Sequence, residues 1–517
     1  MQETIILWAD DEIDLLKPHI LFLEDKGYKV ISKTNGSDAL DVLKSQSVDI
    51  VFLDENMPGL SGLETLSEIK NINNDIPVVL ITKNEEEYLM EDAIGSKIAD
   101  YLIKPVNPKQ ILLTIKKLVD NKRLVTERTT SAYQSEFRNL GLALNDVSSL
   151  NEWKEVYKKL VFWELELEQL EDSGMHEILT LQKQEANKLF SKFVEKNYLK
   201  WLKEESNAPL QSHQLMKTKV FPHLKENIPT FFILIDNLRY DQWRIIAPMI
   251  NDYFRLEEEE IYTSILPTAT QYARNAIFSG LLPSEMEKRY PKLWKNDEDE
   301  GGKNMHEEDF LREHLLRARR DIKFSYTKVL NTDQGKDMVD SIHQKFNNQL
   351  NVIVYNFVDM LSHARSEMEL IKELAPDESA YRSITKSWFE HSPLLEAIKK
   401  IAQKQARLII TTDHGTIRVK NPSKVIGDRT VNTNLRYKQG KNLNYQHKDV
   451  FEVKNPGEAF LPRVNVSQAF IFAKEDTYFV YQNNYNQFVN YYANTFQHGG
   501  ISLEEMLIPY SVYVTRS

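Results

Sequence analysis

The 517-residue chain contains no cysteine, which excludes disulfide bonds and thiolate metal ligands. Any metal site must therefore use nitrogen and oxygen ligands from His, Asp and Glu side chains. The sequence also has no apolar run near the ~18 residues that a membrane helix needs, and its start lacks the basic segment and cleavage site of a signal peptide. We expect a cytoplasmic protein with no membrane span.

The chain also carries no net positive charge. The formal net charge is -11 and the pI is about 5.7, whereas binding to duplex DNA needs a basic surface that releases counterions. Broad duplex DNA binding is therefore not expected, although a local basic groove for a small anion remains possible. With 41% hydrophobic and 27% charged residues the composition is that of a globular protein, and at roughly 150 residues per domain it predicts about three domains.

The first 122 residues predict a parallel α/β sheet, because five short apolar strands alternate with five helical patterns. The expected strands cover residues 4–10, 29–32, 49–54, 78–82 and 100–103. Polar side chains follow several of these strands. They are Asp10, Asp11, Asp54, Thr82 and Lys104. All would meet at one sheet edge, where three carboxylates can hold Mg²⁺ and a lysine balances their charge. Taken singly, each acid could instead be a solvated residue at a strand end.

Four motifs in this region, W-A-D-D-E, F-L-D-E-N-M-P-G, L-I-T-K and Y-L-I-K-P, resemble the receiver domain of two-component response regulators. The resemblance implies a flavodoxin-like (CheY-like) fold in which Asp54 accepts a phosphoryl group from a sensor histidine kinase. It further implies an Mg²⁺ site formed by Asp10, Asp11, Asp54 and the Asn56 carbonyl, and a switch formed by Thr82, Tyr101 and Lys104. Phosphorylation would add charge and acceptor oxygens that draw in the Thr82 hydroxyl and Lys104.

Residues 123–225 predict a helical connector domain, since apolar and aromatic residues such as Trp153, Tyr157 and Leu160 recur at helical spacing. We interpret this stripe as the core of a central helical bundle rather than as a ligand pocket. His176 and His213 have no acidic partners at metal-ligand spacing and are expected at the surface. The connector is expected to transmit dimerisation from the receiver to the effector.

Residues 226–517 return to an α/β pattern, and several apolar strands in this region end in potential metal ligands. The segment 231–236 ends in Asp236, and the segment 408–414 ends in Asp413 and His414. The segment 352–359 ends in Asp359, with His363 four residues later, and His498 precedes two glycines. Each could be a structural or surface residue by itself, but together they form a set of nitrogen and oxygen ligands at strand ends.

Thr270 is expected at or near the N-cap of a helix over residues 271–278. It could be an ordinary helix cap. A hydroxyl there is also well placed for a phosphate, and Arg274, one turn along the same face, could contact a phosphoryl oxygen. Because a neutral hydroxyl is a poor nucleophile and no histidine is adjacent in sequence, a bound cation is the expected activator.

The ordered motifs I-D-N-L-R-Y, P-T-A-T-Q-Y-A-R-N, V-D-M-L-S-H, T-T-D-H-G and H-G-G-I-S-L-E-E-M resemble the alkaline phosphatase superfamily, and within it the PglZ branch. The resemblance implies two Zn²⁺ ions. One would be held by Asp236, Asp413, His414 and Thr270, and the other by Asp359, His363 and His498. It also implies that Thr270 is the nucleophile and forms a phosphothreonine, with Arg274 taking up oxyanion charge. Mn²⁺ also fits this ligand type.

No third metal set is evident, which favours a phosphodiester over a phosphomonoester as substrate. The basic segments 420–429 and 436–448 include Tyr437, Tyr445 and His447. They could line a groove for a nucleotide or form solvated loops.

The order of receiver, helical connector and PglZ-type effector resembles the PorX-type response regulators of type IX secretion. This implies a zinc-dependent phosphodiesterase acting on linear or cyclic oligonucleotides, controlled by phosphorylation and homodimerisation. The alternative is a protein-binding regulator that docks onto a sigma factor, another transcription factor or a secretion component, with a structural or weakly active zinc site.

Overall fold

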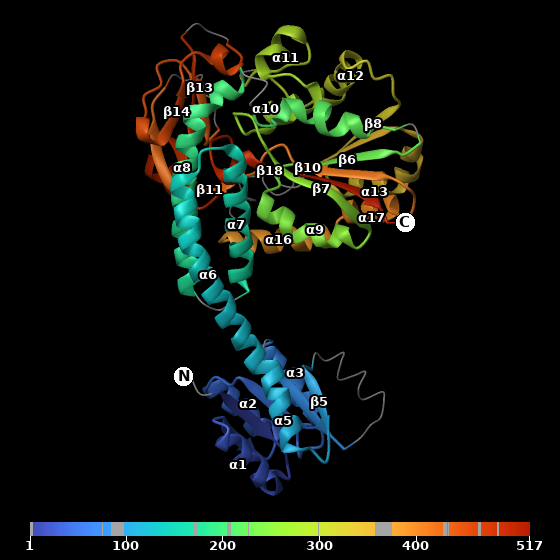
Figure 1. Ribbon diagram of the computed structural model, residues 1–517, viewed down its shortest axis with the longest axis vertical. Helices are drawn as coiled ribbons and strands as arrows, with labels where there is room; N and C mark the ends of the chain where they lie inside the picture. Colours follow the sequence, from blue (N-terminus) through green and yellow to red (C-terminus); the bar gives the residue numbers. More distant parts are fainter. Residues whose placement is uncertain are drawn as a thin grey trace. The chain divides into compact units, whose positions relative to one another are not determined.

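The computed structural model describes residues 4–74, 76–83, 98–169, 173–203, 208–225, 227–297, 299–356, 375–427, 432, 434–463, 467–482 and 485–516. Side chains at 120–128 and 173 are also outside the description. The chain divides into two compact units, Met1–Glu136 and Phe137–Ser517. The division falls within a single helix, α6 (Asn121–Asp146) (Figure 1).

The first unit contains a five-stranded parallel sheet with the order β2-β1-β3-β4-β5. Its strands are β1 (Ile5–Ala9), β2 (Lys29–Lys33), β3 (Ile50–Asp54), β4 (Val78–Thr82) and β5 (Asp100–Ile103). Each lies within one residue of the expected range at both ends. The strand order is that of the flavodoxin-like fold, so the predicted receiver architecture is confirmed.

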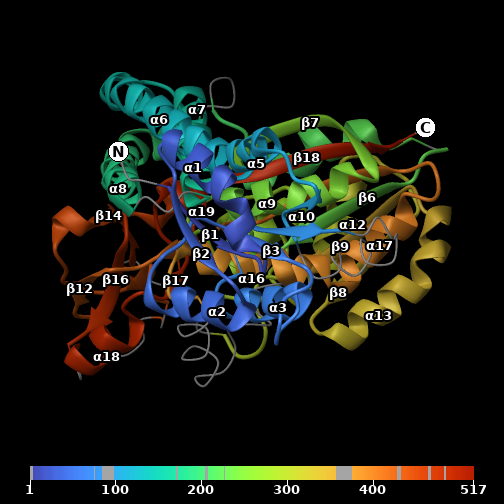
Figure 2. The ribbon, with the colours of Figure 1, turned by 90° about the horizontal axis from the view of Figure 1, so that it is seen from below.

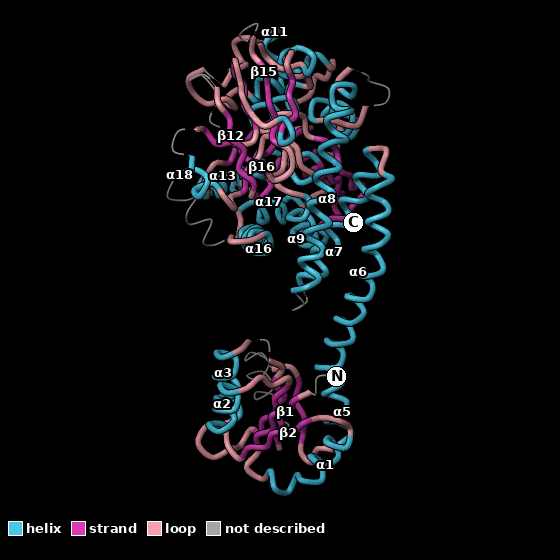
Figure 3. Tube along the Cα trace, turned by 90° about the vertical axis from the view of Figure 1, so that its left-hand side faces the viewer, coloured by secondary structure: helices cyan, strands magenta, loops and turns pink. Residues whose placement is uncertain are grey.

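Helices cover both faces of this sheet, as the tube in Figure 3 shows. Among the residues described, the helices that pack on this sheet are α1 (Lys17–Asp25), α2 (Gly36–Ser45), α3 (Gly62–Ile72) and α5 (Pro108–Ile115). Leu7 and Leu53 face a core that includes Leu66 of α3, whereas Trp8 and Phe52 face a core that includes Ile111 of α5. The alternation of side chains along each strand therefore builds two hydrophobic layers.

The helical part of the second unit contains the end of α6, α7 (Leu150–Glu168) and α8 (Ser173–Trp201). Trp153 of α7 is 1% exposed, and its ring lies 5.4 Å from that of Phe190 in α8. The aromatic stripe is thus a packed helical core, as expected. His213 is not at the surface as predicted: it is half-buried in a short 3₁₀ turn, and burial lowers its pKa to about 4.

A six-stranded sheet with the order β7-β18-β10-β6-β9-β8 forms the centre of the second unit. Four neighbouring strands, β10, β6, β9 and β8, are parallel, and β18 and β7 extend the sheet in antiparallel fashion. The strands are β6 (Thr230–Ile235), β7 (Phe254–Thr263), β8 (Phe324–Val329), β9 (Leu350–Tyr355), β10 (Arg407–Thr411) and β18 (Leu507–Thr515). The predicted strands before Asp236, Asp359 and Asp413 are all present.

Helices lie on both faces of this second sheet (Figures 1 and 2). Two of them, α10 and α12, lie on one face, and α9 and α16 lie on the other. The helices of this part are α9 (Tyr240–Asn251), α10 (Thr270–Ser279), α11 (Pro283–Arg289), α12 (Glu307–Arg317), α13 (Thr332–Ser341), α16 (Glu378–Glu390), α17 (Pro393–Ile401), α18 (Tyr485–Tyr492) and α19 (Leu503–Met506). The first residue of α10, Thr270, lies 3.5 Å from Asp236, so the N-terminus of this helix reaches the carboxyl end of β6.

Small sheets built mostly from residues between β10 and β18 form a separate layer that the sequence did not indicate. Their strands are β11 (Ile417–Arg418), β12 (Asn421–Val425), β13 (Tyr437–Gly440), β14 (Val450–Val453), β15 (Ala469–Ala473), β16 (Thr477–Tyr481) and β17 (Phe496–Gln497). Arg436 is completely buried on Glu505, and Tyr437 is 5% exposed. These two residues belong to the core, so this part of the basic segment is neither a solvated loop nor the wall of an open groove.

Candidate metal centre

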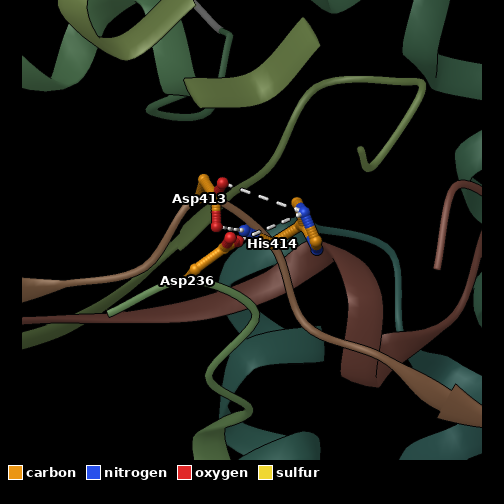
Figure 4. A group of neighbouring side chains, drawn as sticks. All are labelled: Asp236, Asp413 and His414. Carbon is orange, nitrogen blue, oxygen red and sulfur yellow. Dashed lines mark hydrogen bonds and ion pairs between the residues drawn. The ribbon is translucent and has the colours of Figure 1, made fainter. Parts of the chain in front are cut away.

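Asp236 and Asp413 follow two neighbouring parallel strands, β6 and β10. Leu234 pairs with Thr411 in the sheet, so each carboxylate lies two residues beyond a paired position and the two come together at the carboxyl edge. His414 completes a group whose ligand atoms all lie within 4.8 Å of one another, and all three residues are buried (Figure 4). Parallel strand ends thus assemble two carboxylates and an imidazole at the position predicted for a ligand.

The orientation of His414 is fixed by its own loop. Its Nδ1 lies 3.1 Å from the Gly415 carbonyl oxygen, which leaves Nε2 at 3.9 Å from Asp236 Oδ1 and 3.8 Å from Asp413 Oδ2. Gly415 has no room for a side chain, because an added Cβ would lie 2.0 Å from the carbonyl oxygen of Glu504. The close approach of α19 to this loop therefore requires glycine.

Thr270 begins α10, directly after the N-cap residue Ala269. Its Oγ1 lies 3.1 Å from His414 Nε2 and 3.5 Å from Asp236 Oδ1. The structure therefore brings the predicted nucleophile to the group of ligands, at the positive end of a helix.

His498 lies at the same centre, with its ring stacked on that of His414 at 4.2 Å between centroids and 21° between planes. Its Nδ1 lies 3.1 Å from the carbonyl oxygen of Thr268. Such a hydrogen bond fixes the ring and leaves Nε2 as the possible ligand atom. The predicted companions of His498, Asp359 and His363, fall outside the described residues.

The surroundings shift the pKa values of Asp236 and Asp413 in opposite directions. Burial opposes ionisation of Asp236, but the positive charge of the Arg274 guanidinium is the main opposing influence, and the pKa of Asp236 is held below its usual value. Burial and the adjacent charge of Asp236 raise the pKa of Asp413 well above its usual value. Burial lowers the pKa of both histidines, that of His498 to about 4. Neutral imidazoles are the form that binds metals.

These side chains fit a divalent cation. Asp413 Oδ2 is buried and has no hydrogen-bond partner among the described residues, an arrangement that is costly unless another group satisfies it. Two carboxylates that repel each other would be stabilised by a shared cation. Their donors, with the imidazole of His414 and the hydroxyl of Thr270, are the nitrogen and oxygen ligands that suit zinc or manganese.

Arg274 is 1% exposed and lies beside the same carboxylates. Its Nη1 forms an ion pair with Asp236 Oδ2 at 3.1 Å and donates to Asn356 Oδ1 at 3.1 Å, and its Nε donates to Glu307 Oε1 at 2.5 Å. Nη2 has no hydrogen-bond partner among the described residues. Sequence reasoning placed Arg274 near the centre but missed Glu307 and Asn356, because a single Glu in the run E-E-D (307–309) gives no signal of burial.

The first unit has a carboxylate cluster of its own, formed by Asp10, Asp11 and Asp54. Lys104 Nζ lies 2.9 Å from Asp10 Oδ2 and 2.8 Å from Asp54 Oδ1. Burial raises the pKa of Asp54 despite the hydrogen bond from Lys104. Burial also disfavours the Lys104 ammonium, but its bonds to Asp54 and Asp10 prevail and the pKa of Lys104 is raised. The cluster therefore has the acids and the lysine that the sequence predicted.

Of the predicted switch residues, Lys104 belongs to this cluster, and Thr82 and Tyr101 lie on the strands β4 and β5. Thr82 is 7% exposed and its hydroxyl donates to Glu55, the residue after Asp54, whereas Tyr101 is 40% exposed. Asn56 is exposed on the loop after β3. Glu55 as the partner of Thr82 was not predicted.

Buried ion pairs connect the helical part of the second unit to the loop that carries Asp236. Arg382 Nη1 of α16 lies 2.8 Å from Glu164 Oε1 of α7 and 3.0 Å from Asp241 Oδ2. Asp241 is in turn paired with Arg239, three residues after Asp236. One charged network thus joins α7 and α16 to the residues that follow Asp236 in the chain.

Comparison with known families identifies these parts. Residues 215–512 match the family described as the BREX system PglZ alkaline phosphatase-like domain. The chain belongs to the PglZ family. Residues 6–116 match the response regulator receiver domain, and residues 123–202 match the PorX response regulator linker domain. A receiver joined to a PglZ domain through a PorX-type linker is the architecture predicted from the sequence, and a receiver implies a sensor kinase as partner.

Two curated regulatory proteins each match about a quarter of the length of this PglZ-family response regulator. The transcriptional regulatory protein ZraR of Klebsiella oxytoca is 31% identical over 140 residues, 27% of this chain and 32% of that protein. The response regulator SaeR of Staphylococcus aureus (strain USA300) is 34% identical over 116 residues, 22% of this chain and 50% of that protein. The chain thus spans a third to a half of the length of these relatives.

Among solved structures, the response regulator receiver domain protein from Clostridium thermocellum is 29% identical, covers 23% of this chain and 98% of its own, and has a TM-score of 0.22. A CheY-like receiver from Methanospirillum hungatei is 22% identical, covers 24% and 98%, and has a TM-score of 0.23. Within the described parts of the chain, no helix is both long and apolar enough to cross a membrane.

Proposed function

We propose that the PglZ domain of this response regulator is a metal-dependent phosphodiesterase with Thr270 as nucleophile. The observation that carries the proposal is the position of the Thr270 hydroxyl, 3.1 Å from His414 Nε2 and 3.5 Å from Asp236 Oδ1. A purely structural metal site does not need a half-buried hydroxyl among its ligands. The alkaline phosphatase-like family supports hydrolase chemistry.

Asp236, Asp413, His414 and Thr270 would hold one Zn²⁺, and His498 would act with Asp359 and His363 at a second. The bound cations supply Lewis acidity, which lowers the pKa of a coordinated hydroxyl and stabilises charge on the phosphoryl oxygens. Mg²⁺ would be held in the receiver by Asp10, Asp11, Asp54 and the carbonyl of Asn56.

The chain's own residues carry the remaining steps. Thr270 Oγ1 attacks phosphorus in line with the ester oxygen, a phosphothreonine forms, and the P–O ester bond breaks to release an alcohol that takes up a proton. Arg274 Nη2, which has no partner among the described residues, would contact a phosphoryl oxygen during this step. Water then attacks phosphorus, which releases a phosphomonoester and restores the Thr270 hydroxyl.

The substrate class proposed is a linear or cyclic oligonucleotide, and phosphorylation at Asp54 would control activity through homodimerisation. The Thr82, Tyr101 and Lys104 switch would report phosphorylation to the dimer surface. The PorX-type linker supports a role in type IX secretion. A sensor histidine kinase would be upstream, and a sigma factor or secretion component would be a downstream partner of the cytoplasmic protein.

The deciding experiment compares Thr270→Val and Thr270→Ser with the wild type, using a nitrophenyl phosphodiester and measurement of bound metal. Valine keeps the shape of threonine without the hydroxyl and leaves Asp236, Asp413 and His414 as ligands, so at saturating Zn²⁺ we expect full metal content and a loss of hydrolysis of about 10³-fold or more. Serine should retain part of the activity. If the fully metal-loaded wild type hydrolyses the diester no faster than the metal-free protein, the phosphodiesterase proposal fails and a protein-binding regulator becomes the better interpretation.

A further inference from the structure

Arg274 places a fixed positive charge next to the carboxylates proposed to bind metal. Its Nη1 lies 3.1 Å from Asp236 Oδ2, its Nε lies 3.9 Å from Asp413 Oδ2, and the side chain is 1% exposed. A buried cation at this distance competes with a metal ion for the same oxygens and repels it. Such a residue needs its charge balanced by a group that is not itself a metal ligand.

Glu307 has the position and the charge to balance it. This residue begins α12, is 1% exposed, and receives the Arg274 Nε hydrogen bond at 2.5 Å. Its second oxygen accepts from Tyr326 Oη at 2.5 Å and from Lys328 Nζ at 2.8 Å. Both carboxylate oxygens are therefore satisfied, and the first turn of a helix further stabilises the anion.

We infer that Glu307 is a positioning residue of the metal centre, acting through Arg274; this inference rests on the proposed function. Glu307 holds the Arg274 guanidinium by Nε, so that Nη1 supports Asp236 while Nη2 remains available to the substrate. Its negative charge offsets that of Arg274, which leaves the charge of Asp236 and Asp413 available to a cation. Groups that orient and balance metal ligands in this way commonly change metal affinity by about 10–100-fold when mutated.

Replacing Lys328 tests the direction in which the charge around Glu307 changes metal affinity. This lysine shares the charge of Glu307 with Arg274. Without Lys328, Glu307 would neutralise Arg274 more completely, and the metal would be repelled less. Loss of Glu307 and loss of Lys328 should therefore move metal affinity in opposite directions, whereas general damage to the packing would lower affinity in both variants.

The experiment measures Zn²⁺ affinity of the full-length protein by competition with a chromophoric chelator. Glu307→Gln should bind Zn²⁺ at least about tenfold more weakly than the wild type, and Lys328→Met should bind it several-fold more tightly. Glu308→Gln is the matched control, because Glu308 is the next residue, is exposed, and pairs only with the exposed Arg312 among the described residues. It should stay within twofold of the wild type.

A double-mutant cycle with Arg274→Gln tests whether Glu307 changes Zn²⁺ affinity through Arg274. Because Glu307 acts through Arg274, adding Glu307→Gln to the Arg274→Gln variant should change Zn²⁺ affinity by less than threefold. Hydrolysis of the nitrophenyl diester by metal-saturated Glu307→Gln should show a larger fall in kcat than rise in KM, as expected when transition-state contacts of Arg274 Nη2 are misplaced.

The outcomes separate this inference from the proposed function. Unchanged Zn²⁺ affinity in a folded Glu307→Gln protein, or an unchanged or weaker affinity in Lys328→Met, overturns the inference and leaves the phosphodiesterase proposal intact. If Glu307→Gln does not fold, the sign of the Lys328→Met effect decides the question. A wild type that binds no metal overturns the proposed function, and the inference with it.

Discussion

The two carboxylate clusters of this protein have a similar arrangement but differ in how many groups hold their cation in place. Each lies at the carboxyl ends of parallel strands, and each has a cation bridging two aspartates: the half-buried Lys104 in the receiver and the buried Arg274 in the PglZ domain. Lys104 is an ammonium on a flexible stem, and its ion pairs among the described residues are with these two aspartates. Arg274 is a planar fork with a third carboxylate, Glu307, on its Nε.

This difference matches what each centre would have to do. An ammonium group can turn from one oxygen to another, which suits a site where a new phosphoryl group must be accommodated. A guanidinium held by several acceptors keeps one geometry, which suits a site that must present the same ligands in each catalytic cycle. If the proposed function holds, the single lysine suits a receiver cluster that rearranges on phosphorylation, and the guanidinium suits a PglZ cluster that keeps one geometry.

The largest expected effect tests whether the receiver cluster alone takes up the phosphoryl group. Asp54→Asn should abolish phosphorylation by acetyl phosphate with Mg²⁺, because an amide oxygen cannot form the acyl phosphate. It should also abolish the mass increase expected on phosphorylation in sedimentation. Asp41→Asn, in an exposed pair with Lys44, should behave as the wild type. Covalent phosphate on the Asp54→Asn receiver after the same treatment would contradict the assignment.

The next effect concerns the network that joins the helices to the metal-centre loop. Arg382→Met leaves Glu164 and Asp241 buried with fewer partners, and we expect a loss of about 3–5 kcal/mol in the free energy of unfolding of the second unit. Arg312→Met removes an exposed pair and should cost about 0–1 kcal/mol. Urea unfolding of both variants measures the difference. Equal losses in the free energy of unfolding would show that the buried network contributes no more to stability than an exposed ion pair.

A third prediction concerns the repulsion between Asp236 and Asp413. Asp413→Asn can keep the hydrogen bonds that its Oδ1 accepts from the Asn237 and His414 amides, but it removes a charge from the centre. We expect Zn²⁺ affinity to fall about 100-fold, while the metal-free protein becomes as stable as the wild type or more stable, because like charges no longer oppose each other. Chelator competition and thermal unfolding without metal measure the two effects. A less stable metal-free protein would argue that Asp413 has a structural role.

The smallest effect concerns the receiver switch. The Thr82 hydroxyl donates to Glu55, so this bond must break before Thr82 can turn to a phosphorylated Asp54. Glu55→Ala removes the competing acceptor, worth about 1 kcal/mol, and should let the phosphorylated protein dimerise at roughly fivefold lower concentration. Sedimentation across a concentration series would show it. A dimerisation constant equal to that of the wild type would mean that Glu55 does not restrain the switch.

Sequence reasoning was most successful where local pattern and position along the chain carry the information. Each receiver strand was predicted to within one residue at both ends, because an apolar run bounded by turns is a local signal. Asp236, Asp413 and His414 could be grouped from sequence because parallel strands place their carboxyl ends at one edge. The domain boundaries and the roles of Asp359 and His363 remain predictions.

The tertiary structure alone decided which charges are buried together. Glu307 and Glu308 are adjacent and chemically identical, yet one is 1% exposed beside Arg274 and the other is exposed beside Arg312. The same holds for Arg436, which reads as part of a basic segment and is completely buried on Glu505. The sequence determined the strands, the helices and the order of the ligands, because those depend on near neighbours in the chain. The ion pairs that hold Arg274 in place depend on how elements such as α12 pack in the folded domain. Which distant charges pair with one another follows only from that packing.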